Sequence, residues 1–284
     1  MGATFVIALR EGIEAALIVS ILLAYLRQLQ RQDLSRLVWW GTAAAIAISA
    51  LVGTVIFVIG AEFEGTAEEV FEGLVTLTAV GVLTWMIFWM RRQGAQMKGD
   101  LQGKVDTALV TGGIALGLLA FFAVLREGIE TALFLFAAAQ GTAAGAGGVG
   151  AQVLGAILGL GVAVALGVLL YREGIRMNLR SFFRLTGWIL IIVAAGLFAF
   201  AVHELQEAGW LPLLEQTAFD VSPTLPDDSG IGAVLRGLVG YNADPTVLEV
   251  VAWLGYLVVV GALYLRPVTS VASRPITADT SQRR

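Results

Sequence analysis

The chain has 284 residues, of which 57% are hydrophobic and only 14% are charged. A composition this apolar excludes a soluble globular domain and predicts a membrane protein with several spanning segments. The chain has no cysteine and a single histidine, which excludes disulfides, thiolate metal sites and histidine-rich metal sites. The net charge of −4 is small, so the positions of the charges are more informative than their sum.

Seven apolar stretches are long enough to cross a bilayer as helices, so we expect an all-α membrane protein. In chain order, the predicted helices cover residues 4–26, 37–61, 70–90, 109–139, 151–171, 185–206 and 247–265. The fourth is longer than one crossing needs, and Gly112-Gly113 indicates a break or an interfacial start. The first begins close to Met1, lacks a basic leader and contains charges, which argues against a cleavable signal peptide. Residues 231–241 favour a short interfacial helix.

Basic residues follow the odd-numbered predicted helices. Fifteen of the 18 Lys and Arg residues have such positions: Arg27, Arg31, Arg36, Arg91, Arg92, Lys98, Lys104, Arg172, Arg176, Arg180, Arg184, Arg266, Arg274, Arg283 and Arg284. The opposite loops are acidic. Because cytoplasmic loops of membrane proteins are rich in Lys and Arg, the N-terminus is predicted outside and the C-terminus inside. Residues 267–284 are polar and predict a disordered cytoplasmic tail.

One five-residue motif, Arg-Glu-Gly-Ile-Glu, occurs at residues 10–14 and again at 126–130. Each copy lies inside an apolar stretch, where charged side chains are costly and indicate function. The predicted topology makes the first motif helix run inward and the second outward. Residues 4–92 and 108–207 then form two halves of opposite orientation, as in many secondary transporters, with a seventh helix at 247–265. We expect a single membrane domain over residues 1–266.

The spacing within each motif places its charges on one helix face. Arg10, Glu11 and Glu14 fall within an arc of about 100°, and Arg10 can pair with Glu14 at a spacing of four. The same holds for Arg126, Glu127 and Glu130. Gly12 and Gly128 leave the backbone bare, so that another helix can approach closely.

If the two motif helices face each other, Glu11, Glu14, Glu127 and Glu130 form a cation site of hard oxygen ligands with a net charge of −2, counting Arg10 and Arg126. The alternative is that each motif is only a structural ion pair. Such a pair needs one glutamate, and each motif has two.

Two further groups of polar residues are candidates. Glu68, Glu69 and Glu72 form either an acidic vestibule that concentrates cations or a solvated loop at a helix N-terminus. His203, Glu204 and Glu207 offer ligands at the outer end of the sixth predicted helix, although His203 is also typical of a helix-end histidine. The stretch 172–176 resembles the motif but replaces the second carboxylate with Arg176, so it indicates topology. Gly155, Gly159, Gly161 and Gly167 predict close helix packing.

Taken together, these residues resemble the oxidase-dependent iron permeases, and most closely the EfeU-type bacterial members. The likeness is carried by REGIEAALIVS (10–20), EEVFEG (68–73), FFAVLREGIE (121–130) and VGYNADPTVLEV (239–250). It implies iron uptake through the cytoplasmic membrane, with Glu11, Glu14, Glu127 and Glu130 handling iron and Arg10 and Arg126 supporting them. It also implies an extracytoplasmic iron-binding subunit and a haem peroxidase or other iron oxidase as partners. Iron is then a substrate, and no permanently bound cofactor is expected.

Three alternatives remain at this stage. Hard oxygen ligands suit Mn²⁺, Mg²⁺ and Ca²⁺ as well as iron, so the chain could transport another such cation. A membrane di-metal carboxylate oxidase would use Glu-x-x-His pairs, and neither motif has a histidine. A purely structural subunit does not explain six charges inside apolar segments.

The distribution of charge predicts where reporter fusions will be active. Fusions at Arg36 and Gly99 should report a cytoplasmic position, and fusions at Glu64 and Asp228 an external one, because basic loops stay inside. The measurement is paired alkaline phosphatase and fluorescent protein activity. A cytoplasmic signal at Glu64 would contradict the predicted topology.

Overall fold

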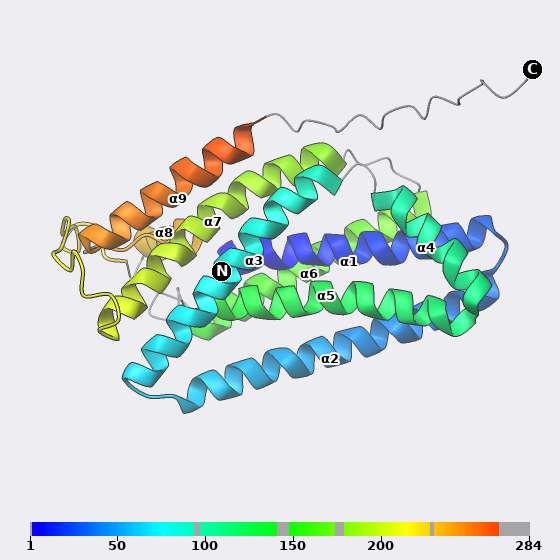
Figure 1. Ribbon diagram of the computed structural model, residues 1–284, viewed down its shortest axis with the longest axis horizontal. Coiled ribbons are helices and arrows are strands. Elements are labelled where there is room, and N and C mark those ends of the chain that lie inside the picture. The colour runs from blue at the N-terminus through cyan, green and yellow to red at the C-terminus, as the bar shows by residue number, and fades with distance from the viewer. Residues whose placement is uncertain (1, 94–96, 141–147, 174–178, 228–229, 267–284) are drawn as a thin grey trace, which may run out of the picture.

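The computed structural model describes residues 2–93, 97–140, 148–173, 179–227 and 230–266. In these residues every regular secondary-structure element is a helix, and loops connect the helices (Figure 1). The helices are α1 (Gly2–Gln28), the short 3-10 helix η1 (Gln32–Leu34), α2 (Ser35–Glu62), α3 (Thr66–Gln93), α4 (Met97–Thr111), α5 (Gly113–Gln140), α6 (Gly148–Glu173), α7 (Leu179–Glu207), α8 (Gly230–Val239) and α9 (Val247–Leu265). Seven long helices therefore coincide with the seven predicted ones, and α8 with the predicted interfacial helix. The predicted tail, 267–284, lies outside the described residues.

The predicted fourth helix is wrong at its start. Gly112 has a φ of +129°, a conformation that favours glycine, and it separates α4 from α5. The amide of Gly112 donates to Ala108 O, and the amide of Ala115 donates to Gly112 O, so the break remains hydrogen-bonded. Residues 109–111 accordingly belong to α4, which the sequence did not predict as a separate helix.

Helix α4 lies across one end of the bundle, against α1 and α5 (Figure 1). Its buried residues Val105 and Ala108 join a small hydrophobic core with Leu22, Leu26 and Leu116. The Tyr25 hydroxyl donates to Asp106 Oδ1 over 2.7 Å and links α1 to α4. Packing against α1 and α5 keeps α4 in place. Its apolar stretch is not long enough to cross a membrane.

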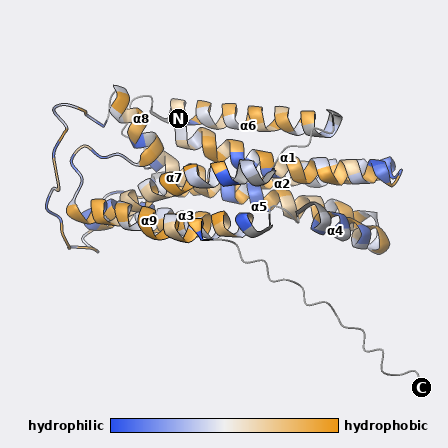
Figure 2. Ribbon diagram, turned by 90° about the horizontal axis from the view of Figure 1, so that it is seen from above, coloured by the Kyte–Doolittle hydropathy of each residue, from blue (hydrophilic) through white to orange (hydrophobic). Residues whose placement is uncertain are grey.

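In the described part of the chain, five helices are long and apolar enough to cross a membrane: α2, α3, α6, α7 and α9. Helices α1 and α5 are of similar length, but each carries the three charged residues of its motif inside its apolar stretch. Many large hydrophobic side chains of α2, α6 and α9 are exposed on the outside of the bundle, among them Ile46, Leu51, Ile157, Val164 and Val258. Figure 2 shows that hydrophobic residues predominate along the long helices, an apolar pattern that runs the length of the bundle. It matches a multi-pass membrane protein whose outer faces meet lipid.

The helices pack in a paired pattern. The motif helices α1 and α5 contact each other at the centre, α6 packs against α1, and α2 packs against α5. Helices α3 and α7 pack together at a tilt to this group, and α9 lies along α7 (Figure 1). The main hydrophobic core joins α1, α3, α5, α7 and α9 through residues such as Ile7, Leu83, Phe134 and Leu190.

The long helices run back and forth between two ends of the bundle that differ in charge (Figure 1). The basic end is where α1, α3 and α9 finish and α2, α5 and α7 begin. Its described basic residues include Arg27, Arg31, Arg36, Arg91, Lys104, Arg184 and Arg266. The acidic end carries Glu62, Glu64, Glu68, Glu69, Glu204, Glu207, Glu215, Asp220, Asp227 and Asp244. The structure thus places the two predicted charge groups at opposite ends.

The glycines of α6 differ in how closely α1 approaches them. A Cβ added at Gly159 would lie 2.5 Å from Phe5 O and 2.8 Å from Leu9 N, which are backbone atoms of α1. A Cβ at Gly167 would lie 2.7 Å from Ala16 Cβ. A Cβ at Gly161, in contrast, would meet nothing within 4 Å, so the prediction that Gly161 is a packing residue is wrong.

This difference gives a matched pair of variants on one helix. Gly159→Ala should destabilise the protein by about 1–3 kcal/mol, because α1 backbone must move to make room. Gly161→Ala should be neutral or slightly stabilising, because alanine favours the helix and its methyl group is unopposed. Thermal unfolding of both purified variants in detergent measures the difference. Equal melting temperatures would contradict the α1–α6 packing.

Candidate cation site

The two motifs meet where α1 and α5 pass each other. One carboxylate oxygen from each of Glu11, Glu14 and Glu127 lies within 4.8 Å of the other two. All three residues are about 1% exposed. The structure therefore brings residues of both motifs into one buried group of acidic side chains. Glu130 lies one turn further along α5, at the edge of this group.

Arg10 is the cation at the centre of the first motif. Its Nη1 donates to Glu11 Oε1 over 2.8 Å, and its Nη2 lies 3.1 Å from Glu14 Oε1. The predicted pairing of Arg10 with Glu14 is confirmed, and the pair with the adjacent Glu11 is additional. Nη1 also lies 3.1 Å from Met86 Sδ, so α3 closes over the guanidinium. Arg10 is only 2% exposed.

Arg126 occupies the matching position in the second motif but has different surroundings. Its Nε donates to Glu127 Oε1 over 3.0 Å, its Nη2 contacts the same oxygen, and Nε lies 3.7 Å from Glu130 Oε1. The guanidinium lies over the Trp89 ring at 4.9 Å, within the range of a cation–π interaction. Its side chain is 44% exposed. The two copies of the motif are therefore equal in sequence and unequal in burial.

Each of the four glutamates keeps one buried oxygen without a hydrogen-bond partner. These atoms are Glu11 Oε2, Glu14 Oε1, Glu127 Oε2 and Glu130 Oε2. For Glu14 Oε1, the contact with Arg10 is an ion pair that lacks hydrogen-bond geometry. A buried carboxylate oxygen without a donor is costly, and a bound cation removes that cost. The donor set, all carboxylate oxygens with excess negative charge, suits a hard cation.

The motif glycines allow close packing, as predicted, but not against each other's helix. A Cβ at Gly12 would lie 2.7 Å from Ala163 Cβ on α6, and one at Gly128 would lie 2.0 Å from Ser49 Oγ on α2. Each motif helix thus presents its charges to the other motif helix and its glycine to a third helix. The glycines fix the positions of α1 and α5 from behind.

The predicted vestibule divides into two parts. Glu68 is exposed and Glu69 is half-buried at the start of α3, whereas Glu72 is 9% exposed and accepts a hydrogen bond from Gln140 Nε2 at the end of α5. The solvated-loop interpretation fits the first two residues. It does not fit Glu72.

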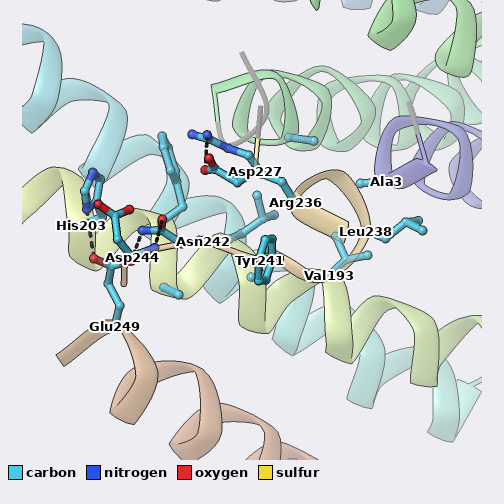
Figure 3. A pocket seen from close by; sticks show the side chains of 16 residues that line it. Ala3, Val193, His203, Asp227, Arg236, Leu238, Tyr241, Asn242, Asp244 and Glu249 are labelled. Carbon is cyan, nitrogen blue, oxygen red and sulfur yellow. Dashed lines mark hydrogen bonds and ion pairs between the residues drawn. The ribbon is translucent and has the colours of Figure 1, made fainter. Parts of the chain in front are cut away.

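His203 joins α7 to the beginning of α9. Its Nδ1 lies 3.0 Å from Glu249 Oε1 (Figure 3), and its Nε2 lies 3.4 Å from Glu207 Oε1. Asn242 donates to Glu249 Oε2, and Thr246 and Glu249 form a capping box at the start of α9. Sequence reasoning missed Glu249, although the Thr-x-x-Glu spacing is a recognisable helix-start signal. The contacts favour a structural helix-end role for His203.

A cavity of about 240 Å³, lined by both polar and apolar residues, opens beside this cluster at the acidic end. Its lining includes His203, Glu249, Tyr241 and the ion pair between Arg236 Nη1 and Asp227 Oδ2 at 2.7 Å (Figure 3). Ala3 of α1 and Ala138 of α5 also line it. The cavity therefore lies above the motif helices, on the side where α1 begins and α5 ends.

These features define a multi-pass membrane protein with a buried cluster of carboxylates where its two motif helices meet. The chain belongs to the iron permease FTR1 family, whose sequence pattern matches residues 1–277. It is a permease, and so a transporter rather than an enzyme. Iron is its transported substrate.

Individual relatives agree with the family. The chain is 44% identical to the ferrous iron permease EfeU of Escherichia coli O157:H7, over 91% of this chain and 93% of the relative. It is 40% identical to the ferrous iron permease EfeU of Yersinia pestis, over 98% of both chains. The protein of Escherichia coli K12 described as a putative inactive ferrous iron permease EfeU is also 44% identical. No solved structure shows significant similarity to the chain.

The unequal burial of the two arginines gives a testable difference in stability. Arg10→Ala leaves Glu11 and Glu14 buried without their cation and should destabilise the protein by about 3–5 kcal/mol. Arg126→Ala should destabilise it by less, because Arg126 is half exposed and partly solvated. Thermal unfolding in detergent, at a pH where glutamates ionise, measures both changes. Equal losses would contradict the difference in burial.

Proposed function

We propose that the chain takes up iron across the cytoplasmic, or inner, membrane and that the ion passes through a site formed by Glu11, Glu14, Glu127 and Glu130. The observation that carries this proposal is the convergence of both motifs in one buried group, with an unpartnered oxygen on every glutamate. Family membership supports iron as the cargo.

The proposed topology has seven membrane spans, with the acidic end outside and the basic end inside. The five apolar helices supply five spans, and α1 and α5 supply the other two. The separation of charge between the two ends supports this orientation, because Lys and Arg are retained on the cytoplasmic side. Counted along α1 and α5, the motif residues lie about 12–21 Å below the acidic end.

The two halves of the chain are proposed to be an inverted repeat over 4–92 and 108–207 within one membrane domain. In such a repeat α1 corresponds to α5, α2 to α6, and α3 to α7. The packing supports this, because each contact has its equivalent when every helix is replaced by its counterpart in the other half. The α1–α6 contact then becomes the α5–α2 contact, and the α1–α5 and α3–α7 contacts remain the same. The contacts of Gly12 with α6 and of Gly128 with α2 exchange in the same way. A transporter built this way binds its substrate between the halves.

The proposed partners act at the acidic end. The relatives are named ferrous iron permeases, so we propose that Fe²⁺ reaches this end. An extracytoplasmic iron-binding subunit and a haem peroxidase or other iron oxidase would deliver it and change its valence. The acidic residues of the segment between α7 and α9 would attract a basic surface on such a partner.

Removing one charge from the site should stop uptake without unfolding the protein. Glu11→Gln, Glu14→Gln or Glu127→Gln keeps side-chain size and polarity but removes a charged ligand. Each should reduce iron uptake into proteoliposomes at least about tenfold. Glu215→Gln, in the external segment, is the control and should transport normally. Normal uptake in both Glu11→Gln and Glu127→Gln would overturn the shared site, and stronger competition by Mn²⁺ than by unlabelled iron would overturn iron as the cargo.

Acid should inhibit uptake because protons and iron compete for the same carboxylates. With equal pH on both sides and ascorbate keeping iron reduced, the initial uptake rate should fall as pH is lowered from 7 towards 5. The measurement is the rate at several iron concentrations. A true competition is overcome by more iron, whereas an acid-induced loss that saturating iron does not restore would contradict it.

A further inference from the structure

Two carboxylates that the sequence places far apart lie in the same region of the acidic end, on α3 and α7. Glu72 lies near the start of α3 and Glu204 near the end of α7. The helices touch beside them, because a Cβ added at Gly73 would lie 3.0 Å from Leu205 Cγ. Glu72 is the charged group that acts most strongly on Glu204. Both residues are about 9% exposed.

Glu204 is the unusual member of this pair. It is buried to nine-tenths, and its carboxylate has no hydrogen bond or ion pair within the described part of the chain. Its charged neighbours besides Glu72 and His203 are the carboxylates Glu69 and Glu207. Among the described residues its one basic neighbour is His203, whose ring nitrogens are directed at Glu249 and Glu207. A carboxylate on a largely buried residue, without a donor and surrounded by other carboxylates, would be stabilised by a bound cation.

A neutral oxygen donor is also present. Gln140 closes α5 and donates its amide hydrogen to Glu72 Oε1. The side-chain oxygen of the same amide is an acceptor, so Gln140 can both orient Glu72 and face a cation. Three helices, α3, α5 and α7, thus bring oxygen atoms to one place at the acidic end.

This place is separate from the four motif glutamates. Gln140 lies ten residues beyond Glu130 on α5, which corresponds to about 15 Å. On α3, the buried residues Glu72, Thr76, Ala79, Leu83 and Met86 follow one another at helical spacing along one face. Met86 contacts Arg10 at the far end of this stripe. One ion cannot touch both groups, but the same face of α3 connects them.

Thr76 lies on this stripe between the two groups. It is fully buried, and its Oγ1 has no hydrogen-bond partner. Buried hydroxyl groups usually have a hydrogen-bond partner, so Thr76, like Glu204, is an unusual residue for an apolar core. It gives an oxygen one turn below Glu72, on the side of α3 that continues to Arg10.

We propose that Glu72 and Glu204, assisted by Gln140, form a second cation site that accepts an iron ion at the acidic end before it reaches the motif glutamates. Thr76 then offers an oxygen on the way down. The hard oxygen donors define the ligand class as a hard di- or trivalent cation. The transport role of this site rests on the proposed function, whereas its ability to bind a cation does not.

The first test is cation binding by the purified full-length protein in detergent, with Mn²⁺ as an electron paramagnetic resonance probe. Wild type should bind one more ion per chain than Glu204→Gln. A Glu14→Gln/Glu127→Gln double variant should lose the other ion and keep this one. Glu207→Gln is the matched control, since Glu207 lies on the same helix, is 55% exposed and should not change the count. Equal binding by wild type and Glu204→Gln would overturn the proposal.

The second test separates the two sites by transport. Glu204→Gln should raise the iron concentration for half-maximal uptake about tenfold and leave the maximal rate nearly unchanged. Glu68→Gln, an exposed control on α3, should change uptake only at low salt. A Glu204→Gln protein that unfolds is replaced by Glu204→Asp, which should retain the bound ion. If wild type binds the additional ion but transports no iron, the proposed function fails and this site stands; if Glu204→Gln transports with wild-type affinity, its role in uptake is overturned.

Discussion

The structure depends on the placement of four carboxylates and two guanidinium groups between apolar helices. Arg10 and Arg126 neutralise only half of the negative charge on the four motif glutamates, and α1 and α5 can pack together only while that charge is accommodated. Arg10 contributes most, because it is fully buried and contacts both glutamates of its own motif. The remaining oxygens stay without donors. The way the two helices meet therefore leaves a buried excess of negative charge, which is the basis of the proposed cation site.

The rest of the bundle holds this arrangement in place. Gly12 and Gly128 let α6 and α2 press the motif helices together from opposite sides. Helix α3 touches both arginines, through Met86 for Arg10 and through Trp89 for Arg126. A tilt of α3 would change both contacts together. Arg10 is buried and Arg126 is half exposed. The two motifs therefore differ in their exposure to solvent even though their sequences are the same.

Much of this could be predicted from the sequence, because the signals are local. Apolar length predicts the seven long helices, and the spacing of four predicts the pairing of Arg10 with Glu14. The duplication predicts that the two motifs share a site. The break at Gly112 was also visible as a glycine pair, but α4 itself was not, since it is polar and is stabilised by packing against α1 and α5.

What the sequence does not contain is the set of contacts between distant helices. Nothing local distinguishes Arg10 from Arg126, because their difference in burial arises from where α3 crosses. The spacing of the glycines in α6 also does not indicate that Gly159 contacts α1 whereas Gly161 does not. Glu72 and Glu204 lie in the same region of the acidic end, although nothing in the sequence relates one to the other. Glu249 was missed for the same reason, since its partner His203 lies 46 residues away.

The central claim is that an iron ion binds between the two motifs, and locating iron directly tests it. Crystals of the protein loaded with iron under reducing conditions, measured on both sides of the iron absorption edge, reveal iron through its anomalous scattering. The account predicts a peak in contact with carboxylate oxygens of Glu11, Glu14 and Glu127. Fully loaded crystals with no iron peak between α1 and α5, and with Arg10 and Arg126 alone neutralising the glutamates, would contradict it.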